Sequence, residues 1–246
     1  MSQTHPVALV TGAARRVGAV IARTLHGAGY DLALHCRNSR AELDVLIGEL
    51  DAQRAHSTLA LQADLADAGQ LPGLIDATIA RFGRLDGLVN NASIFHAAPV
   101  GTITPEAWDA FLSVNARAPL LLAQAAAPHL KTSRGAIVNI TDIYAERPLP
   151  QYAAYCTSKA ALRMATLALA QELGPEIRVN AVAPGNVLWS ENPIKAETPQ
   201  TLLEQTALQR QGTPEDIAGA VLWLIRDAGY VTGQTIRVDG GRILGA

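Results

Sequence analysis

Short apolar runs rich in β-branched residues alternate along the chain with longer segments in which apolar residues recur every three or four positions. Runs such as GAIVNIT are almost continuously apolar, as is typical of strands buried on both faces of a parallel sheet. The pattern predicts strands at residues 7–11, 32–36, 58–63, 85–90, 136–140, 178–183 and 235–238. It predicts helices at residues 17–28, 41–55, 70–82, 105–130, 153–173 and 214–226.

This alternation predicts an α/β fold with one Rossmann-type, doubly wound parallel sheet of about seven strands and helices on both faces. The chain has 246 residues, of which 49% are hydrophobic, so it is long enough for one sizeable core. We therefore expect a single dinucleotide-binding domain over residues 1–246. Residues 186–207 interrupt the alternation and are rich in polar residues and proline. They are interpreted either as a substrate lid beside the site or as a surface insertion.

Composition argues against several classes of function. The net charge is −2 and no long run of Lys and Arg occurs, so nucleic acid and anionic membranes are poor candidates for partners. No apolar stretch is long enough to span a bilayer, and MSQTHPVALVTG enters a strand without a signal segment. Cys36 and Cys156 fit no metal-binding spacing, which favours a reduced cytoplasmic protein. The histidines are scattered without an HExxH pair, so no metal site is expected.

The first predicted strand runs directly into TGAARRVG, residues 11–18. Gly12 permits a tight turn, and Gly18 lets the following helix pack close to the strand. The free N–H groups at the start of that helix favour a pyrophosphate. Arg16 stands where such loops often have glycine, so an ordinary strand–helix turn is the alternative. The residues expected to contact the cofactor are Gly12, Arg15, Arg16, Val17 and Gly18.

The end of the second predicted strand, HCRNSR at residues 35–40, bears on the choice between NAD and NADP. A carboxylate there would bind the ribose hydroxyls, whereas a cation would accept a 2′-phosphate. Asp31 lies at the wrong end of this strand, while Arg37 offers a fork of donors and Arg40 adds charge. NADPH is therefore predicted, although Arg37 could also be a solvated surface cation. The expected contacts here are His35, Arg37, Asn38 and Ser39.

Two more strand ends supply polar side chains. Asp64, followed by Leu65, ends the third predicted strand, where its carboxylate could meet the adenine edge. The motif NNAS follows the fourth strand, and its small residues and amides could line the nicotinamide ribose. Asn91, Ala92 and Ser93 are its expected contacts. All these loops lie at the carboxyl ends of strands, where open α/β sheets bind their ligands.

Tyr155 and Lys159 are one helical turn apart, so both side chains project from one face of a predicted helix. A tyrosine has a pKa of about 10, and a nearby ammonium favours the phenolate. The spacing therefore predicts a tyrosine whose pKa is lowered enough for proton transfer. By itself this pair could equally be two residues of an amphipathic helix.

Taken together, the motifs TGAARRVG, NNAS, SVNARAP, YCTSK, NAVAPG and VTGQTIRVDGG resemble the short-chain dehydrogenase/reductase family over nearly the full chain. The resemblance implies that Lys159 also holds the nicotinamide ribose and that Asn115 helps to hold a water relay to Lys159. It implies that Pro184, Gly185 and Val187 lie near the carboxamide of the cofactor. It also implies a homotetramer with the helices at 105–130 and 153–173 in its interfaces.

Asp142, thirteen residues before Tyr155, replaces the serine that this family usually carries. An ionised carboxylate would repel the oxyanion that develops during reduction of a ketone. It would instead suit a substrate rich in N–H groups. The alternative is a loop acid that caps a backbone turn.

The segments GAARRVG, HCRNS and NNASIF, with the interval from Asp142 to Tyr155, resemble the pteridine reductases and the dihydromonapterin or dihydrofolate reductases of the short-chain type. By this resemblance Arg16 would lie between the cofactor phosphate and the pterin, and Ser93 would hydrogen-bond the pterin or the cofactor. Phe95 would stack on the pterin, unless it packs inward as an ordinary loop residue. Asp142 and Tyr155 complete the expected substrate contacts.

The sequence thus predicts an NADPH-dependent oxidoreductase that transfers a hydride to a C=N bond of a pterin or dihydropterin. The catalytic residues would be Asp142, Tyr155, Lys159 and Asn115. A short-chain reductase for 3-oxoacyl or sugar carbonyls is the alternative, because the fold does not fix the substrate. A protein that senses NADP(H) without catalysis is a further alternative. Biopterin, monapterin and dihydrofolate remain equally open as the natural substrate.

Overall fold

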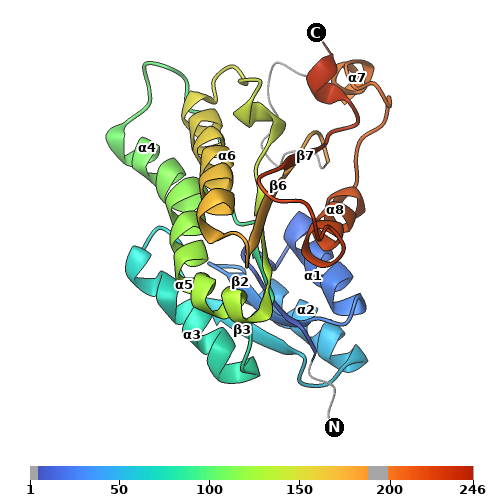
Figure 1. Cartoon of the computed structure of the whole chain (residues 1–246). Helices are drawn as coiled ribbons and strands as arrows, with labels where there is room; N and C mark the ends of the chain where they lie inside the picture. Colours follow the sequence, from blue (N-terminus) through green and yellow to red (C-terminus); the bar gives the residue numbers. More distant parts are fainter. Residues whose placement is uncertain (1–4, 188–198, 246) are drawn as a thin grey trace.

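A seven-stranded sheet forms the centre of the computed structural model, which describes residues 5–187 and 199–245. The strand order is β3-β2-β1-β4-β5-β6-β7, and every neighbouring pair is parallel (Figure 1). The order reverses between β1 and β4, which creates a crevice at the carboxyl ends of the strands. The strands are β1 Val7–Val10, β2 Asp31–Cys36, β3 Thr58–Gln62, β4 Gly87–Asn90, β5 Ala136–Ile140, β6 Arg178–Pro184 and β7 Thr235–Val238.

Helices cover both faces of the sheet, as the hydrophobic pattern predicts (Figure 1). Along β1, Ala8 and Val10 face one core, and Val7 and Leu9 face the other. The first core is closed by α1 Arg16–Gly27, α2 Arg40–Gln53 and α8 Pro214–Arg226. The second is closed by α3 Leu71–Phe82, α5 Ala118–Ser133 and α6 Ala153–Leu173. The strands are buried on both sides, which explains their nearly continuous apolar sequences.

The predicted helix at 105–130 is wrong as a single element. It is divided into α4 Pro105–Leu112, a π-helical turn Ser113–Arg117, and α5. Pro119 has no N–H group, so the carbonyl of Asn115 cannot receive the ordinary hydrogen bond from the residue four positions later. The apolar periodicity continues through this turn and therefore hides it.

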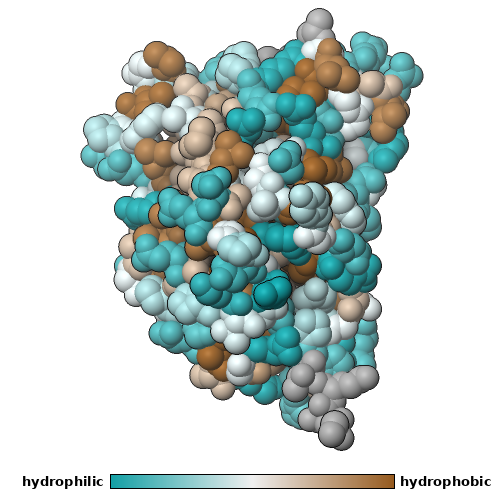
Figure 2. All heavy atoms as spheres, viewed as in Figure 1, coloured by the Kyte–Doolittle hydropathy of each residue, from teal (hydrophilic) through white to brown (hydrophobic). Residues whose placement is uncertain are grey.

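The predicted lid at 186–207 is described only in part. Residues 188–198 lie outside the described residues, and the remainder contains the short helix α7 Pro199–Glu204. Among the described residues, no helix combines the length and the apolar character that a bilayer crossing requires. Figure 2 shows apolar patches separated by hydrophilic side chains on the face in view.

Candidate active site

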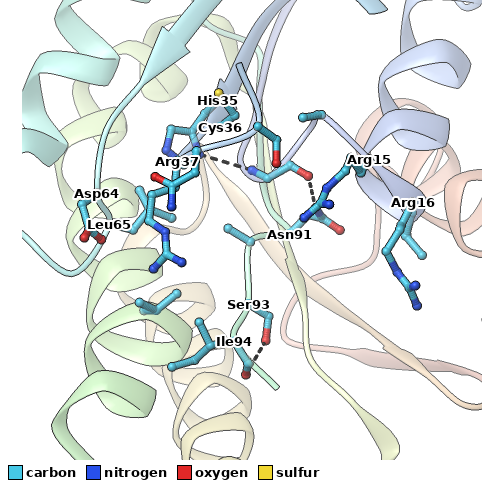
Figure 3. A pocket seen from close by; sticks show the side chains of 18 residues that line it. Arg15, Arg16, His35, Cys36, Arg37, Asp64, Leu65, Asn91, Ser93 and Ile94 are labelled. Atoms are coloured by element: carbon cyan, nitrogen blue, oxygen red, sulfur yellow. Dashed lines mark hydrogen bonds between the residues drawn. The ribbon is translucent and has the colours of Figure 1, made fainter. Parts of the chain in front are cut away.

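The carboxyl ends of β1, β2, β3 and β4 open onto a cavity of about 440 Å³ (Figure 3). Arg37 and Asp64 lie toward one end of this cavity, and Arg15 and Arg16 lie toward the other. The structure brings together most of the residues that the motifs predicted for the cofactor, namely Gly12, Arg15, Arg16, Val17, Gly18, His35, Arg37, Asn38, Ser39, Asp64, Leu65, Asn91, Ala92 and Ser93.

The cavity is also lined by four residues that were not predicted from the motifs. They are Ala14, Cys36, Ile94 and Val114. Each lies inside or beside a segment already recognised, so its position in the motif was the available signal. Their small or apolar side chains carried no chemical signal of their own.

The glycines of the first loop allow this loop to pack closely against α1 and the NNAS loop. Gly12 has a φ of +63°, and a Cβ at this position would lie 2.9 Å from the Cα of Ala92. A Cβ on Gly18 would lie 2.1 Å from the carbonyl oxygen of Gly12. Any side chain would therefore force the loop and α1 apart. Arg16 also has a left-handed φ of 53°, which explains why such loops often have glycine at this position.

The side chains of His35 and Asn91 hold this loop through hydrogen bonds to its backbone. The Nδ1 atom of His35 accepts a hydrogen bond from the Gly12 N–H at 3.3 Å, and its Nε2–H donates to the Ala63 carbonyl at 3.1 Å. Burial lowers the pKa of His35, so the ring stays neutral in this arrangement. The Asn91 amide donates to the carbonyls of Thr11 and Gly12 at 2.9 and 3.0 Å. Both predicted cofactor residues thus shape the pocket with their side chains.

The end of the pocket at β2 presents the cation that the NADP prediction requires. Arg37 and Asn38 are exposed, and Ser39 is the N-cap residue of α2. Asp31 lies at the opposite end of β2 and forms an ion pair with Arg54 at 3.1 Å. Arg40, which was predicted to add charge here, forms an exposed ion pair with Asp44 at 2.8 Å.

Asp142 and Tyr155 form a direct hydrogen bond. The Tyr155 hydroxyl donates to Oδ2 of Asp142 at 2.6 Å, and Oδ1 of Asp142 accepts from the Tyr144 N–H at 2.9 Å. Asp142 therefore caps a backbone turn and also faces the phenol, while its contact with a substrate stays a prediction. Lys159 is buried, and its ammonium donates to the Ile140 carbonyl at 2.9 Å.

Burial dominates the electrostatics of this group. It raises the pKa of Asp142, and the Tyr144 N–H, the Tyr155 hydroxyl and the charge of Lys159 offset this only in part. Burial and then the charge of Asp142 raise the pKa of Tyr155 well above its usual value. The prediction that the pKa of Tyr155 is lowered is therefore wrong for this structure. Burial also lowers the pKa of Lys159 to about 8. Tyr155 consequently keeps its proton at neutral pH and donates it in the hydrogen bond to Asp142.

Asn115 lies in the π-helical turn and joins the NNAS loop to α6. Its Oδ1 accepts from the Ile94 N–H at 2.9 Å and from the Ser93 hydroxyl at 3.2 Å. Its Nδ2 donates to the Ile94 carbonyl at 3.1 Å and to the Ser158 hydroxyl at 3.0 Å. These bonds use the full capacity of the amide. A water relay from Asn115 to Lys159 would therefore have to begin at the main chain of Asn115.

Phe95 is half-buried beside Tyr155. Its ring stacks on Tyr152 with a centroid distance of 4.7 Å and meets Tyr155 edge-on at 4.7 Å. One face of Phe95 is therefore covered by Tyr152. A flat substrate would have to use the opposite face.

Pro184, Gly185 and Val187 lie at the carboxyl end of β6 and are not among the residues that line the cavity. Gly185 is closely packed, because a Cβ there would lie 2.6 Å from the Cβ of Asp239. Val187 is buried in the first core. Within residues 5–187 and 199–245, no cluster of three or more His, Cys, Asp and Glu side chains is placed to hold a metal ion.

A family model described as Enoyl-(Acyl carrier protein) reductase matches residues 12–242. The chain belongs to the short-chain dehydrogenase/reductase family. Two curated relatives illustrate its range of substrates. Pteridine reductase 1 of Leishmania tarentolae is 36% identical, and the alignment covers 98% of this chain and 97% of the relative. The 3-oxoacyl-(acyl-carrier-protein) reductase FabG of Staphylococcus aureus is also 36% identical, and the alignment covers 95% of this chain and 96% of the relative.

Two solved structures superimpose closely on this chain. A blue fluorescent protein from a metagenomic library, in complex with NADPH, has a TM-score of 0.91 and 36% identity, with 98% of this chain and 99% of that chain covered. The FolM alternative dihydrofolate reductase 1 of Brucella suis, in complex with NADP, has a TM-score of 0.88 and 33% identity, with 98% and 96% covered. The doubly wound fold predicted from the sequence is confirmed.

Proposed function

We propose that this oxidoreductase is an NADPH-dependent pteridine reductase, which reduces a C=N bond of a pterin or dihydropterin to give the tetrahydro form. The observation that carries the proposal is the 2.6 Å hydrogen bond between Tyr155 and Asp142. A carboxylate in this position accepts hydrogen bonds from the amino and ring N–H groups of a pterin, whereas it would oppose the oxyanion of a reduced ketone.

The cavity at the ends of β1 to β4 would hold NADPH. Gly12, Gly18 and the start of α1 leave room for the pyrophosphate, and Arg37 would accept the 2′-phosphate. When bound, the cofactor supplies the hydride. The complexes of the blue fluorescent protein and of the Brucella suis reductase with NADPH and NADP support this assignment.

The chain's own groups would manage the substrate and its proton. Tyr155 holds the proton that a ring nitrogen would receive, and Asp142 accepts from the substrate while fixing the direction of the phenol. Lys159 supplies positive charge beside them. Phe95 would cover one side of the pterin with the ring face that Tyr152 leaves open. Arg16 and Ser93 would contact the edge of the pterin near the cofactor.

The substitution Asp142→Ser tests the proposal. We expect kcat/KM for dihydrobiopterin, dihydromonapterin and dihydrofolate to fall about 100-fold, because the acceptor and the partner of Tyr155 are lost. The dissociation constant of NADPH, measured by fluorescence titration, should stay within about two-fold because Asp142 lies outside the cofactor cavity.

Asp67→Ser is the matched control. Asp67 caps a 3₁₀ turn as Asp142 does, by accepting from the Gly69 N–H at 2.9 Å, but its other carboxylate oxygen accepts from Gln70 instead of from a tyrosine. Unchanged pterin turnover in Asp142→Ser would disprove the assigned role.

A 3-oxoacyl reductase is the second candidate, favoured by the 36% identity to FabG of Staphylococcus aureus. The same variant separates the two functions. For a carbonyl reductase, Asp142→Ser would restore the neutral hydroxyl donor and raise the turnover of 3-oxoacyl substrates. For a pteridine reductase, both substrate classes would be reduced slowly.

The proposal includes a homotetramer, as the family resemblance implies. Leu120 on α5 and Met164 on α6 are 39% and 60% exposed, which leaves apolar surface on the helices expected at the interfaces.

A further inference from the structure

Arg117 ends the π-helical turn Ser113–Arg117 and extends to a different part of the chain. Its Nη2 donates to the carbonyl of Ala66 at 2.6 Å. Ala66 belongs to the loop that follows β3, so this bond joins the π-helical turn to the end of the pocket that carries Asp64 and Leu65. A guanidinium bonded to a backbone carbonyl at this distance is a strong, charge-assisted contact.

Ala66, whose carbonyl accepts from Arg117, also contacts Asp64 through its own N–H. The N–H of Ala66 donates to Oδ1 of Asp64 at 2.9 Å, which fixes the direction of the carboxylate. The loop is closed further by bonds from the Asp67 N–H to the Asp64 carbonyl at 3.0 Å and from the Asp64 N–H to Gln70 Oε1 at 3.1 Å. Arg117 therefore supports, from outside the cavity, the residue that fixes the Asp64 carboxylate.

The same π-helical turn serves both ends of the cavity. Asn115 fixes Ser93 and Ile94 at the nicotinamide end, and Val114 lines the wall. Arg117 fixes the loop after β3 at the adenine end. A regular α-helix would rotate these three side chains relative to one another, so the irregular turn has a direct consequence for the shape of the pocket.

We propose that Arg117 is a positioning residue for cofactor recognition, which aims the Asp64 carboxylate at the adenine amino group through Ala66. The proposal rests on the proposed contact between Asp64 and adenine, and it does not depend on the identity of the substrate. The proposal predicts an effect on adenine recognition alone. Loss of Arg117 should weaken the recognition of a 6-amino purine and leave the phosphate and nicotinamide contacts intact.

The experiment compares NADPH with reduced nicotinamide hypoxanthine dinucleotide phosphate, in which a 6-oxo group replaces the 6-amino group. Both bind without substrate and are followed by nicotinamide fluorescence. We expect Arg117→Ala to raise the dissociation constant of NADPH about five-fold and that of the hypoxanthine analogue less than about two-fold. Asp64→Asn should reduce the discrimination between the two cofactors, and adding Arg117→Ala to it should reduce it no further.

Arg81→Ala is the matched control. Arg81 is exposed like Arg117, and its Nη2 donates to the His56 carbonyl at 2.7 Å, at the opposite end of β3 from the pocket. It should change neither dissociation constant. Arg117→Gln, with thermal unfolding recorded for every variant, provides the same comparison if Arg117→Ala does not fold. An equal rise for both cofactors, or no rise for NADPH, would overturn the proposal. A failure to reduce pterins would leave this result unaffected.

Discussion

Burial brings the pKa of Lys159 nearer to neutrality than that of an ordinary lysine. Its ammonium is buried and donates to the Ile140 carbonyl at 2.9 Å, and burial lowers its pKa to about 8 despite the opposing charge of Asp142. A buried lysine loses its charge more readily than a solvated one because water no longer stabilises the ammonium. At neutral pH the group remains mostly protonated, so an ammonium would make the proposed contact with the nicotinamide ribose.

The pH dependence of activity should report this group. We expect kcat/KM for NADPH, which reflects the free enzyme, to fall as pH rises through about 8, because the ammonium is lost above its pKa. Lys159→Arg keeps the charge, since a guanidinium stays protonated, and should move the fall beyond pH of about 10 although with lower activity. A profile for the wild-type protein that stays flat up to pH of about 10 would contradict the assignment.

Arg37 is expected to determine the preference for NADPH at the end of β2. Arg37→Ala should raise the KM for NADPH about ten-fold and leave the KM for NADH unchanged, because only the 2′-phosphate loses a charged partner. Steady-state kinetics with both cofactors measure this. Arg40→Ala is the control, because the Arg40 side chain is already engaged by Asp44 at 2.8 Å. Equal effects on NADPH and NADH would show that Arg37 only shapes the loop.

At the scale of single elements, the junction of β1 and α1 depends on close contact between backbones. Gly18 lies in the first turn of α1, and a Cβ there would lie 2.1 Å from the Gly12 carbonyl. Gly18→Ala should therefore abolish NADPH binding and lower the free energy of unfolding by about 2 kcal/mol or more.

Gly27→Ala provides the control within the same helix. A Cβ on Gly27 would meet no atom of the neighbouring elements within 4 Å, so this change should preserve both binding and stability. Thermal unfolding and fluorescence titration of the two variants check the prediction. Normal NADPH binding by Gly18→Ala would show that the loop can move away from α1 without harm.

The elements differ in how far the sequence could predict them. The buried parallel strands were predicted closely, since a run such as Ala136–Ile140 is apolar almost throughout and bounded by polar residues. The π-helical turn Ser113–Arg117 was not predicted, because its effect on the apolar periodicity is smaller than the scatter of apolar positions in a helix. Most of the cofactor pocket followed from strand ends. The hydrogen bond from Arg117 to Ala66 could not be predicted, because 51 residues separate the partners and no motif joins them.

At the scale of the whole molecule, the β3 edge of the sheet is held at both ends by buried histidines. Nε2 of His26 forms a hydrogen bond of 2.8 Å with the Ser57 hydroxyl just before β3, and Nε2 of His35 forms one of 3.1 Å with the Ala63 carbonyl just after it. Burial lowers the pKa of both rings. At His26 the charge of Arg54 acts in the same direction, while Asp31 and Asp51 oppose it.

These histidines predict a loss of stability in mild acid. Below the unfolded pKa of 6.5, the unfolded chain binds protons that the folded rings resist, so stability falls as pH falls. Each ring contributes at most about 1.4 kcal/mol per pH unit. Asp142 acts in the opposite direction because its folded pKa is raised.

The test therefore compares His26→Gln with the wild type. The free energy of unfolding of both proteins is measured in urea at several pH values between 5 and 7. The variant should lose less stability on acidification, and in the wild type the amides of β3 should be the first to lose protection from hydrogen exchange. Equal pH slopes for the two proteins would show that His26 already titrates normally in the folded state, and the tether to Ser57 would then have no part in acid sensitivity.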